Sequence, residues 1–319
     1  MTPPNHRATW FDQDWSLDEL VERKNNRTVS VVLPALDEQE TVAGVIDSIR
    51  ELVGSLVDEL IVVDSGSTDE TIARARAAGA TVYTREEALP HVAPIPGKGE
   101  VLWRSLNVAS GDLIVFVDSD LIEPSPKFVP ALLAPLLFDE RVHLVKGFYR
   151  RPLSGAGPGD SGGGRVTQLL ARPLLTALLP ELGEILQPLG GEYAATRELL
   201  TSIPFAPGYG VEIGILVDAW LRYGIEAIGQ VDLGIRIHRN RPTHELAVMS
   251  RQIVATLFGR TGIADSGIGL TQYLPHGSTW QPTTTGVSAQ DRPPMATPSP
   301  PLIDGATSYS MAFPEIGAR

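Results

Sequence analysis

Short apolar runs alternate with segments of helical periodicity through the first half of the chain. The runs occupy residues 28–33 (TVSVVL), 59–63 (ELIVV), more weakly 81–83 (TVY), and 113–117 (LIVFV). Between them, apolar residues recur at helical spacing over 42–53, 69–78 and 98–109. Apolar strands separated by helices are typical of a parallel sheet covered on both faces. The sequence therefore predicts an α/β fold.

Acidic and polar residues follow three of these runs. Asp37 and Glu38 follow the first, residues 64–69 (DSGSTD) follow the second, and residues 118–120 (DSD) follow the fourth. In open parallel sheets, ligands bind at the carboxyl ends of the strands. We therefore expect the three clusters to lie together in one site.

The second half of the chain is less regular. Glycine is dense over 154–164, so we expect irregular structure there, followed by a helix from Val166. A strand is predicted over 231–237 and an amphipathic helix over 246–258. The chain is divided into an N-terminal arm (1–27), two core regions (28–150 and 151–274) and a tail (275–319). The tail holds 8 of the 26 prolines and no motif. The tail is therefore expected to be irregular, and residues from about 280 onward are expected to be dispensable for chemistry.

Composition excludes several classes of protein. The chain has no cysteine, which rules out a disulfide scaffold, a zinc-thiolate site and a cysteine nucleophile. It has no apolar run of about 20 residues and no apolar stretch behind its first charges, so neither a membrane span nor a signal peptide is expected. A net charge of −12 disfavours binding to nucleic acid or anionic lipid. We expect a cytoplasmic protein with no nucleic-acid or membrane partner.

Asp118 and Asp120 are the strongest candidates for a metal site. Two carboxylates two residues apart at a strand end can point into one site, and divalent cations prefer such oxygen ligands. A cation held there could neutralise the diphosphate of a nucleotide sugar. The alternative is a turn in which the aspartates cap backbone N–H groups. The position after a buried run, in line with the other clusters, favours the metal site.

Ser65 and Lys98 are candidate nucleotide contacts. Ser65 lies in the turn after the second run, where Ser67 or Thr68 could equally cap the next helix. Lys98 lies in the tripeptide GKG, which lacks the spacing of a P-loop and could be a glycine turn with a solvated lysine. Residues 34–38 (PALDE) could line a base and ribose, or could simply begin a helix.

A second anion site is expected at residues 162–167 (GGGRVT), where a glycine run opens a helix. Exposed N–H groups, the helix dipole and Arg165 together attract a phosphate or carboxylate. A flexible linker would also be rich in glycine, but it would not need arginine and threonine at its ordered end.

His238 and Glu212 are less certain from the residues alone. His238 ends the last predicted strand and is followed by Arg239, Asn240 and Arg241. A lone histidine is usually structural, but a neutral imidazole could complete an aspartate-bound metal site. Glu212 begins a helix after a glycine turn, where a carboxylate could complement the helix dipole or bind sugar hydroxyls.

Eight motifs, in order along the chain, resemble the glucosyl-3-phosphoglycerate synthases, a family of nucleotide-sugar glycosyltransferases of the GT-A type. They are PALDE, DSGSTDET, GKGEVLWRSL, FVDSDL, GGGRVT, QPLGGEYA, PFAPGYGVEIG and IRIHRNRP. The resemblance runs from residue 10 or so to residue 275. It is far more specific than any one motif.

This resemblance implies a GT-A (Rossmann-like) nucleotide-sugar-binding sheet over 28–150 and a mostly helical acceptor-binding and dimerisation region over 151–274. It implies a homodimeric, retaining hexosyltransferase that uses Mg²⁺ or Mn²⁺. Glucose would pass from UDP-glucose to the 2-hydroxyl of D-3-phosphoglycerate. The product, glucosyl-3-phosphoglycerate, would serve glucosylglycerate and methylglucose lipopolysaccharide synthesis.

The resemblance also implies residue roles. Donor contacts are Pro34, Ala35, Leu36, Glu38, Ser65, Lys98, Asp118, Ser119, Asp120, Tyr209, Glu212 and Arg236. Acceptor contacts are Gly164, Arg165, Val166, Thr167 and Asn240. Metal ligands are Asp120 and His238, and catalytic roles fall to Asp120, Glu212 and Leu189. Asp37 is a departure, because related proteins often have Asn there. It adds negative charge beside the nucleotide and leaves the choice between UDP and GDP open.

Other functions stay open at this point. A transferase of the same fold acting on a polyprenyl phosphate would be expected to carry membrane anchors or a basic amphipathic surface, and neither is evident. A non-catalytic sugar-nucleotide sensor would keep the binding residues and lack turnover. A nucleotidyltransferase would need a basic glycine-rich loop where this chain has PALDE. Glu212 is the obvious candidate for a carboxylate nucleophile, but we expect it to bind sugar hydroxyls.

Overall fold

The computed structural model describes residues 8–10, 15–150, 164–236, 242–288 and 290–296. His238 and Asn240, predicted above to bind metal and acceptor, lie outside the described residues.

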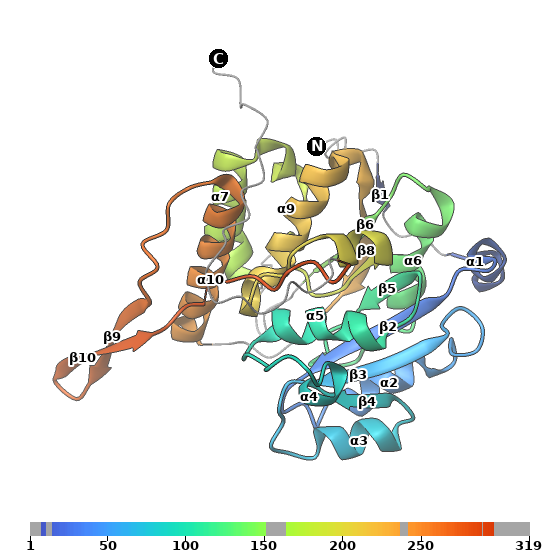
Figure 1. Cartoon of the computed structure of the whole chain (residues 1–319), viewed down its shortest axis with the longest axis horizontal. Helices are drawn as coiled ribbons and strands as arrows, with labels where there is room; N and C mark the ends of the chain where they lie inside the picture. The colour runs from blue at the N-terminus through green and yellow to red at the C-terminus, as the bar shows by residue number, and fades with distance from the viewer. Residues whose placement is uncertain (1–7, 11–14, 151–163, 237–241, 289, 297–319) are drawn as a thin grey trace.

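An eight-stranded sheet forms the centre of the molecule (Figure 1). Its order is β1-β8-β6-β7-β5-β2-β3-β4. The strands are β1 (Thr9–Trp10), β2 (Val29–Ala35), β3 (Glu59–Asp64), β4 (Thr81–Thr84), β5 (Leu113–Phe116), β6 (Leu144–Arg150), β7 (Tyr193–Thr196) and β8 (Ile228–Ile235). Strands β2, β3, β4 and β5 pair in parallel as the apolar runs predicted, and the α/β fold class is confirmed.

The sheet is mixed rather than wholly parallel, because β7 lies antiparallel to both of its neighbours, β5 and β6. Its four residues, YAAT, are too few and too small to stand out as an apolar run. In this direction, Tyr193 at the start of β7 pairs with Phe116 at the end of β5. The glycine turn at 190–191 therefore meets the carboxyl end of β5, beside Asp118.

Helices cover both faces of the sheet. On one face lie α1 (Leu17–Lys24), α2 (Val42–Arg50), α3 (Thr71–Ala77) and α6 (Phe128–Phe138). On the other lie α5 (Lys98–Val108), α7 (Arg172–Leu178), α8 (Arg197–Ser202), α9 (Val211–Tyr223) and α10 (Thr243–Thr261). The remaining helices are α4 (Arg85–Ala88), η1 (Thr167–Ala171), η2 (Pro180–Glu184), η3 (Gly208–Gly210) and η4 (Ile225–Ala227). Alternate residues of β2 enter opposite cores, Val31 and Leu33 one and Val32 the other, as the pleat requires.

The turn after β3 differs in detail from its prediction. The expected N-cap at Ser67 or Thr68 is wrong, because α3 begins at Thr71 and its N-cap position makes no side-chain cap bond. Instead, the carboxylate of Asp64 accepts hydrogen bonds from the N–H groups of Gly66 (2.8 Å) and Ser67 (2.9 Å). The acidic strand end thus shapes the turn itself.

The sheet does not stop at the predicted region boundaries. Strand β1, from the N-terminal arm, pairs with β8, and the sheet is continuous across residue 150. No helix in the part of the chain that the structure describes is both long and apolar enough to cross a membrane.

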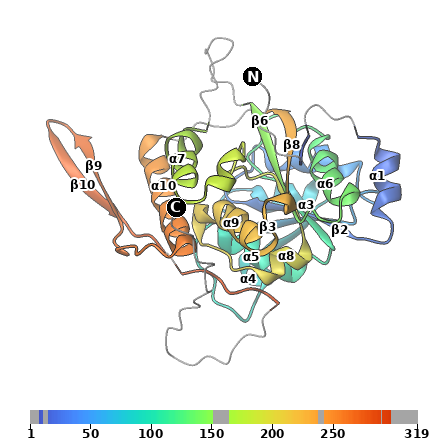
Figure 2. The same cartoon turned by 90° about the horizontal axis from the view of Figure 1, so that it is seen from above.

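The C-terminal region is more ordered than the sequence indicated. Strands β9 (Leu270–His276) and β10 (Thr279–Thr285) form an antiparallel hairpin that extends away from the body (Figures 1 and 2). The prediction of irregular structure from 275 onward is therefore wrong for this segment. It rested on prolines such as Pro275 and Pro282, which are typical of irregular structure. Proline is tolerated in edge strands, and both strands of a two-stranded sheet are edge strands. Further on, Arg292 forms a backbone bridge with Phe205.

Candidate active site

The carboxyl ends of β2, β3 and β5 open onto one cavity of about 740 Å³. The three acidic clusters of the sequence share it, as expected from parallel strands. Every described residue predicted for donor or catalysis lines it: Pro34, Ala35, Leu36, Glu38, Ser65, Lys98, Asp118, Ser119, Asp120, Leu189, Tyr209, Glu212 and Arg236. The acceptor candidates Gly164, Arg165, Val166 and Thr167 line it as well. Their individual roles stay predictions.

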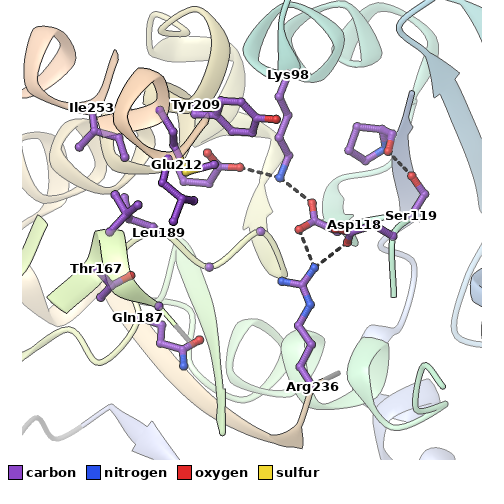
Figure 3. Close-up of a pocket in the computed structure, with 18 of the residues that line it drawn as sticks. Lys98, Asp118, Ser119, Thr167, Gln187, Leu189, Tyr209, Glu212, Arg236 and Ile253 are labelled. Atoms are coloured by element: carbon purple, nitrogen blue, oxygen red, sulfur yellow. Dashed lines mark hydrogen bonds and ion pairs between the residues drawn. The ribbon is translucent and has the colours of Figure 1, made fainter. Parts of the chain in front are cut away.

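Lys98 connects the end of β5 with helix α9, because it contacts both Asp118 and Glu212. It is the first residue of α5, and its Nζ lies 2.5 Å from Asp118 Oδ1 and 2.7 Å from Glu212 Oε1 (Figure 3). Burial works to lower the pKa of Lys98, but the charges of Asp118 and Glu212 raise it well above its ordinary value. The ammonium therefore stays charged, and Lys98 is not the solvated lysine of the simpler interpretation.

Arg236 approaches Asp118 from the side opposite to Lys98 (Figure 3). Its Nη2 donates to Asp118 Oδ2 at 3.1 Å and to Asp120 Oδ1 at 2.7 Å, while Nη1 contacts buried Glu192 at 3.3 Å. Burial tends to raise the pKa of Asp118, but Lys98 and Arg236 together hold it well below its usual range. Asp118 is therefore an anion between two cations.

The two aspartates of the DSD motif are not equivalent. Asp118 contacts both Lys98 and Arg236 and its side chain is 19% exposed, whereas Asp120 contacts Arg236 and is 31% exposed. A side chain on Gly191 would clash with Asp118, since an added Cβ would lie 2.3 Å from Oδ2. Asp118 is thus fixed within the protein, and Asp120 is the carboxylate more open to a ligand.

The residues present fit a divalent cation at Asp120. Carboxylate oxygens are the ligands that Mg²⁺ and Mn²⁺ prefer, and Asp120 presents its carboxylate to the cavity. Over the described residues, no group of three His, Cys, Asp or Glu side chains could hold a metal by itself. The second predicted ligand, His238, lies outside those residues.

The loop after β2 is tied to the neighbouring strand ends. The hydroxyl of Ser119 donates to the carbonyl of Pro34, which joins the end of β5 to the end of β2 (Figure 3). Asp37 has a φ of 54°, a left-handed conformation that Asn and Asp tolerate best. Its carboxylate accepts from the Thr68 N–H at 2.8 Å, and its own N–H donates to Ser67 Oγ at 2.9 Å. Asp37 thus stabilises the turn after β3 through these hydrogen bonds, and an asparagine could make the same bonds.

The acceptor candidates lie at the start of a helix, as the sequence predicted. Gly164 has a φ of 78°, and its carbonyl accepts from the Gln168 N–H at 2.9 Å, so the helical turn begins directly after it. Thr167 begins η1, a π-helical segment, and such segments are frequent at functional sites. The first N–H groups of a helix have no intrahelical partner and favour an anion.

Several cavity residues were missed by the sequence analysis. Gln187 lines the cavity beside Leu189, and its Nε2 donates to the carbonyl of Tyr149 at 2.5 Å. Others that line it are Val101, Arg150, Gln168, Leu186, Leu246, Met249 and Ile253. Three of these belong to α10, which the sequence predicted only as an amphipathic helix. Apolar periodicity cannot distinguish a core face from a cavity wall.

Lys146 lies beneath the glycine turn at 190–191, which lines the cavity. It is buried in β6, and its Nζ donates to the carbonyl of Gly190 at 2.6 Å and lies 4.5 Å from the ring centroid of Tyr193. Burial lowers its pKa to about 8. Lys146 therefore supports the glycine turn next to Leu189.

Comparison with known proteins relates this chain to sugar transferases. Residues 30–160 match the model of the family "Glycosyl transferase family 2". The chain is 64% identical over 293 residues to a glucosyl-3-phosphoglycerate synthase of Mycolicibacterium smegmatis, covering 92% of this chain and 97% of that protein. It is 61% identical over 295 residues to a protein of the same name from Mycobacterium tuberculosis, covering 90% of this chain and 91% of that protein.

Solved structures give the same relationship. The Mycobacterium tuberculosis glucosyl-3-phosphoglycerate synthase bound to Mg²⁺ and UDP superposes with a TM-score of 0.85 at 61% identity, covering 90% of this chain and 98% of that one. A complex of the same enzyme with Mn²⁺, UDP-glucose and phosphoglyceric acid gives a TM-score of 0.83 at 60% identity, over 90% and 97% of the two chains.

Proposed function

The chain belongs to the glucosyl-3-phosphoglycerate synthase family, and from that premise we propose how its cavity carries out the reaction. It is a glycosyltransferase that moves glucose from UDP-glucose to 3-phosphoglycerate with a divalent cation as cofactor. The comparisons favour neither a polyprenyl-phosphate acceptor nor a sugar-nucleotide sensor. The observation that carries the mechanism is a single cavity with alternating charges at the strand ends on one side and a helix start on the other.

We assign the donor nucleotide to the loops after β2 and β3. Pro34, Ala35, Leu36, Glu38 and Ser65 line this part of the cavity. The Ser119 bond to the Pro34 carbonyl holds this wall in place before the ligand arrives. The diphosphate would then extend toward the cations Lys98 and Arg236, which are already charged and oriented.

The cofactor is assigned to Asp120, with His238 as a second ligand. A divalent cation bound there neutralises charge on the departing diphosphate. Arg236 fixes the geometry of this site, because its guanidinium donates to both Asp118 and Asp120. Because these charges are oriented in advance, little reorganisation is needed when the sugar–phosphate bond breaks.

Glu212 is assigned to the hydroxyls of glucose rather than to covalent catalysis. It is buried, and its carboxylate is already paired with Lys98 at 2.7 Å, which makes it a poor nucleophile. Tyr209 and Leu189 line the cavity and complete the sugar pocket. We propose that the transfer proceeds with retention and without a glycosyl-enzyme intermediate on Glu212.

We assign the acceptor to the start of the helix at Gly164 to Thr167, with Asn240 as a further contact. Arg165 and the first N–H groups of that helix suit the anionic end of 3-phosphoglycerate. The 2-hydroxyl is the proposed nucleophile. The enzyme is further proposed to be a homodimer, which sedimentation can test, and to act in the cytoplasm, where its charged phosphorylated substrates are dissolved.

The direct test is a transfer assay with purified protein, UDP-glucose, D-3-phosphoglycerate and Mg²⁺. We expect glucosyl-3-phosphoglycerate with the α-configuration of the donor preserved, as read by NMR of the anomeric proton. GDP-glucose and glycerol 3-phosphate serve as comparison substrates. A β-linked product would overturn the proposed retention. Accumulation of a glucosylated Glu212 would overturn its assignment to the sugar hydroxyls.

A further inference from the structure

A short C-terminal segment, residues 290–296, returns from the hairpin and docks against the body. We call it the strap. Arg292 exchanges two backbone hydrogen bonds with Phe205, each of 2.9 Å. The indole Nε1 of Trp103 in α5 donates to the carbonyl of Pro293 at 2.8 Å. The strap is thus bonded both to α5 and to the segment that leads into η3 and α9.

The side chain of Arg292 makes the strongest of these contacts. Its Nε donates to Glu100 Oε2 at 2.6 Å and its Nη2 to Glu100 Oε1 at 2.9 Å. On its other side, Glu100 accepts from Arg104 Nε at 2.5 Å. Glu100 and Arg104 are both fully buried. Loss of Arg292 would leave a buried carboxylate with one of its two cations, which is costly in a medium of low polarity.

Glu100 lies in the first turn of α5, two residues after Lys98. Between them, Gly99 packs so closely on Ala206 that an added Cβ would lie 1.9 Å from its carbonyl oxygen. The Nη2 of Arg292 also donates to the carbonyl of Ala93, in the segment that leads into α5. The strap therefore contacts both the first turn of α5, which carries Lys98, and the segment that leads into it.

The strap also reaches α9, the helix that carries Glu212. Asp291 in the strap lies 2.5 Å from Arg260, and Arg260 in turn lies 2.7 Å from Asp218 in α9. The strap is consequently connected to both of the helices whose side chains, Lys98 and Glu212, meet in the cavity. No described residue of the strap lines the cavity itself, so an effect of the strap on ligands must pass through those helices.

We propose that Arg292 is a positioning residue for the donor. Through Glu100 it sets the first turn of α5, so that Lys98 lies between Asp118 and Glu212. This inference rests on the assignment of Lys98 to the donor side in the proposed function. It also reverses the expectation that residues from about 280 onward are dispensable, since residues 290–296 are required for full affinity toward UDP-glucose.

The test compares Arg292→Ala with Arg292→Lys and with Arg251→Ala. Arg251 forms a similarly close ion pair, with Asp265, away from α5, so its removal controls for the loss of an arginine. We expect Arg292→Ala to raise the Kd of UDP-glucose with Mg²⁺ about tenfold by calorimetry, within the range of coupled sites. The KM for 3-phosphoglycerate should change less than about twofold, and Arg292→Lys should recover part of the loss because it keeps the charge.

Lys98→Met identifies the route of the effect. If Arg292 acts through Lys98, adding Arg292→Ala to Lys98→Met should weaken UDP-glucose binding by less than about a further twofold. Full additivity, or an equal loss for both substrates in Arg292→Ala, would overturn the inference. Trp103→Phe, which removes the bond to the Pro293 carbonyl and keeps a smaller aromatic ring, is the milder variant if Arg292→Ala does not fold.

Two failures can be told apart. If Lys98→Met leaves UDP-glucose binding unchanged, the donor assignment of Lys98 is wrong and the strap inference falls with it. If Lys98→Met weakens the donor and Arg292→Ala and Trp103→Phe do not, only the strap inference is wrong.

Discussion

The two sides of the cavity are built on different physical principles. The donor side consists of strand ends and helix starts whose charged side chains are already paired with one another, in the order Glu212, Lys98, Asp118, Arg236 and Asp120. The acceptor side, around 164–168, consists of a helix start with largely uncharged side chains, and the glycine turn at 190–191, which packs against Asp118, forms the boundary between the two sides. The donor side therefore binds through charges fixed in advance. The acceptor side binds mainly through its shape, with one anion site at the helix start.

This difference suggests a division of labour. A diphosphate that gains charge as its bond to glucose breaks is best stabilised by charges fixed beforehand. A small phosphorylated acid needs selection by size and by one anion contact. Mutations on the donor side should therefore weaken donor binding or slow the chemical step, whereas those on the acceptor side should mainly affect acceptor affinity.

Asp120→Asn tests the donor side and should have the largest effect. It removes the carboxylate charge proposed for the cation and keeps the shape of the side chain. We expect kcat to fall by about 100–1,000-fold, the size of effect typical of a lost preorganised electrostatic group, and the activating Mg²⁺ concentration to rise. Asp265→Asn, which also breaks an aspartate–arginine pair but lies outside the cavity, is the matched control. Equal loss in both variants would show that the effect is structural.

Arg165→Ala tests the acceptor side. Losing a charge-assisted contact to a bound anion costs about 2–5 kcal/mol. We therefore expect the KM for 3-phosphoglycerate to rise by about 30-fold or more, with kcat at saturation much less affected. Arg165→Lys should retain part of the affinity. A fall in kcat with an unchanged acceptor KM would remove the distinction between the two sides.

Lys146→Met tests the support beneath the boundary between the two sides, and its effect should be smallest. The pKa of Lys146 is about 8 in the fold against an ordinary 10.5. Between these values the unfolded chain binds more protons, so the stability of the wild type should rise with pH. From pH 7 to pH 9 we expect this group to add about 1 kcal/mol to the free energy of unfolding. Urea denaturation of Lys146→Met should lack that increase. Parallel pH profiles for both proteins would contradict the burial of a titrating lysine.

The donor side could be predicted from the sequence better than the acceptor side. Buried parallel strands are continuous apolar runs, and their carboxyl ends share one edge, so Asp118 and Asp120 could be placed near Ser65 without coordinates. The pairing of Lys98 with Glu212 could not, because the two residues are far apart in the chain and meet only through tertiary packing.

The remaining features lacked any local signal. Strand β7 is too short to be recognised, and it decides where the glycine turn lies. The hairpin of β9 and β10 could not be predicted, because its prolines are typical of irregular structure. The strap is recognisable only from its partners, since nothing in the sequence around Arg292 points to Glu100 or Phe205.

The central claim is that the two substrates bind to separately built sides of one cavity, and calorimetry on two variants tests it most directly. Wild type, Lys98→Met and Arg165→Ala are titrated with UDP-glucose and Mg²⁺, and then with 3-phosphoglycerate in the presence of UDP and Mg²⁺. We expect Lys98→Met to weaken UDP-glucose at least about tenfold and 3-phosphoglycerate less than about twofold, and Arg165→Ala to give the reverse pattern. If both variants weaken the same substrate, or if Arg165→Ala weakens only UDP-glucose, the division is contradicted.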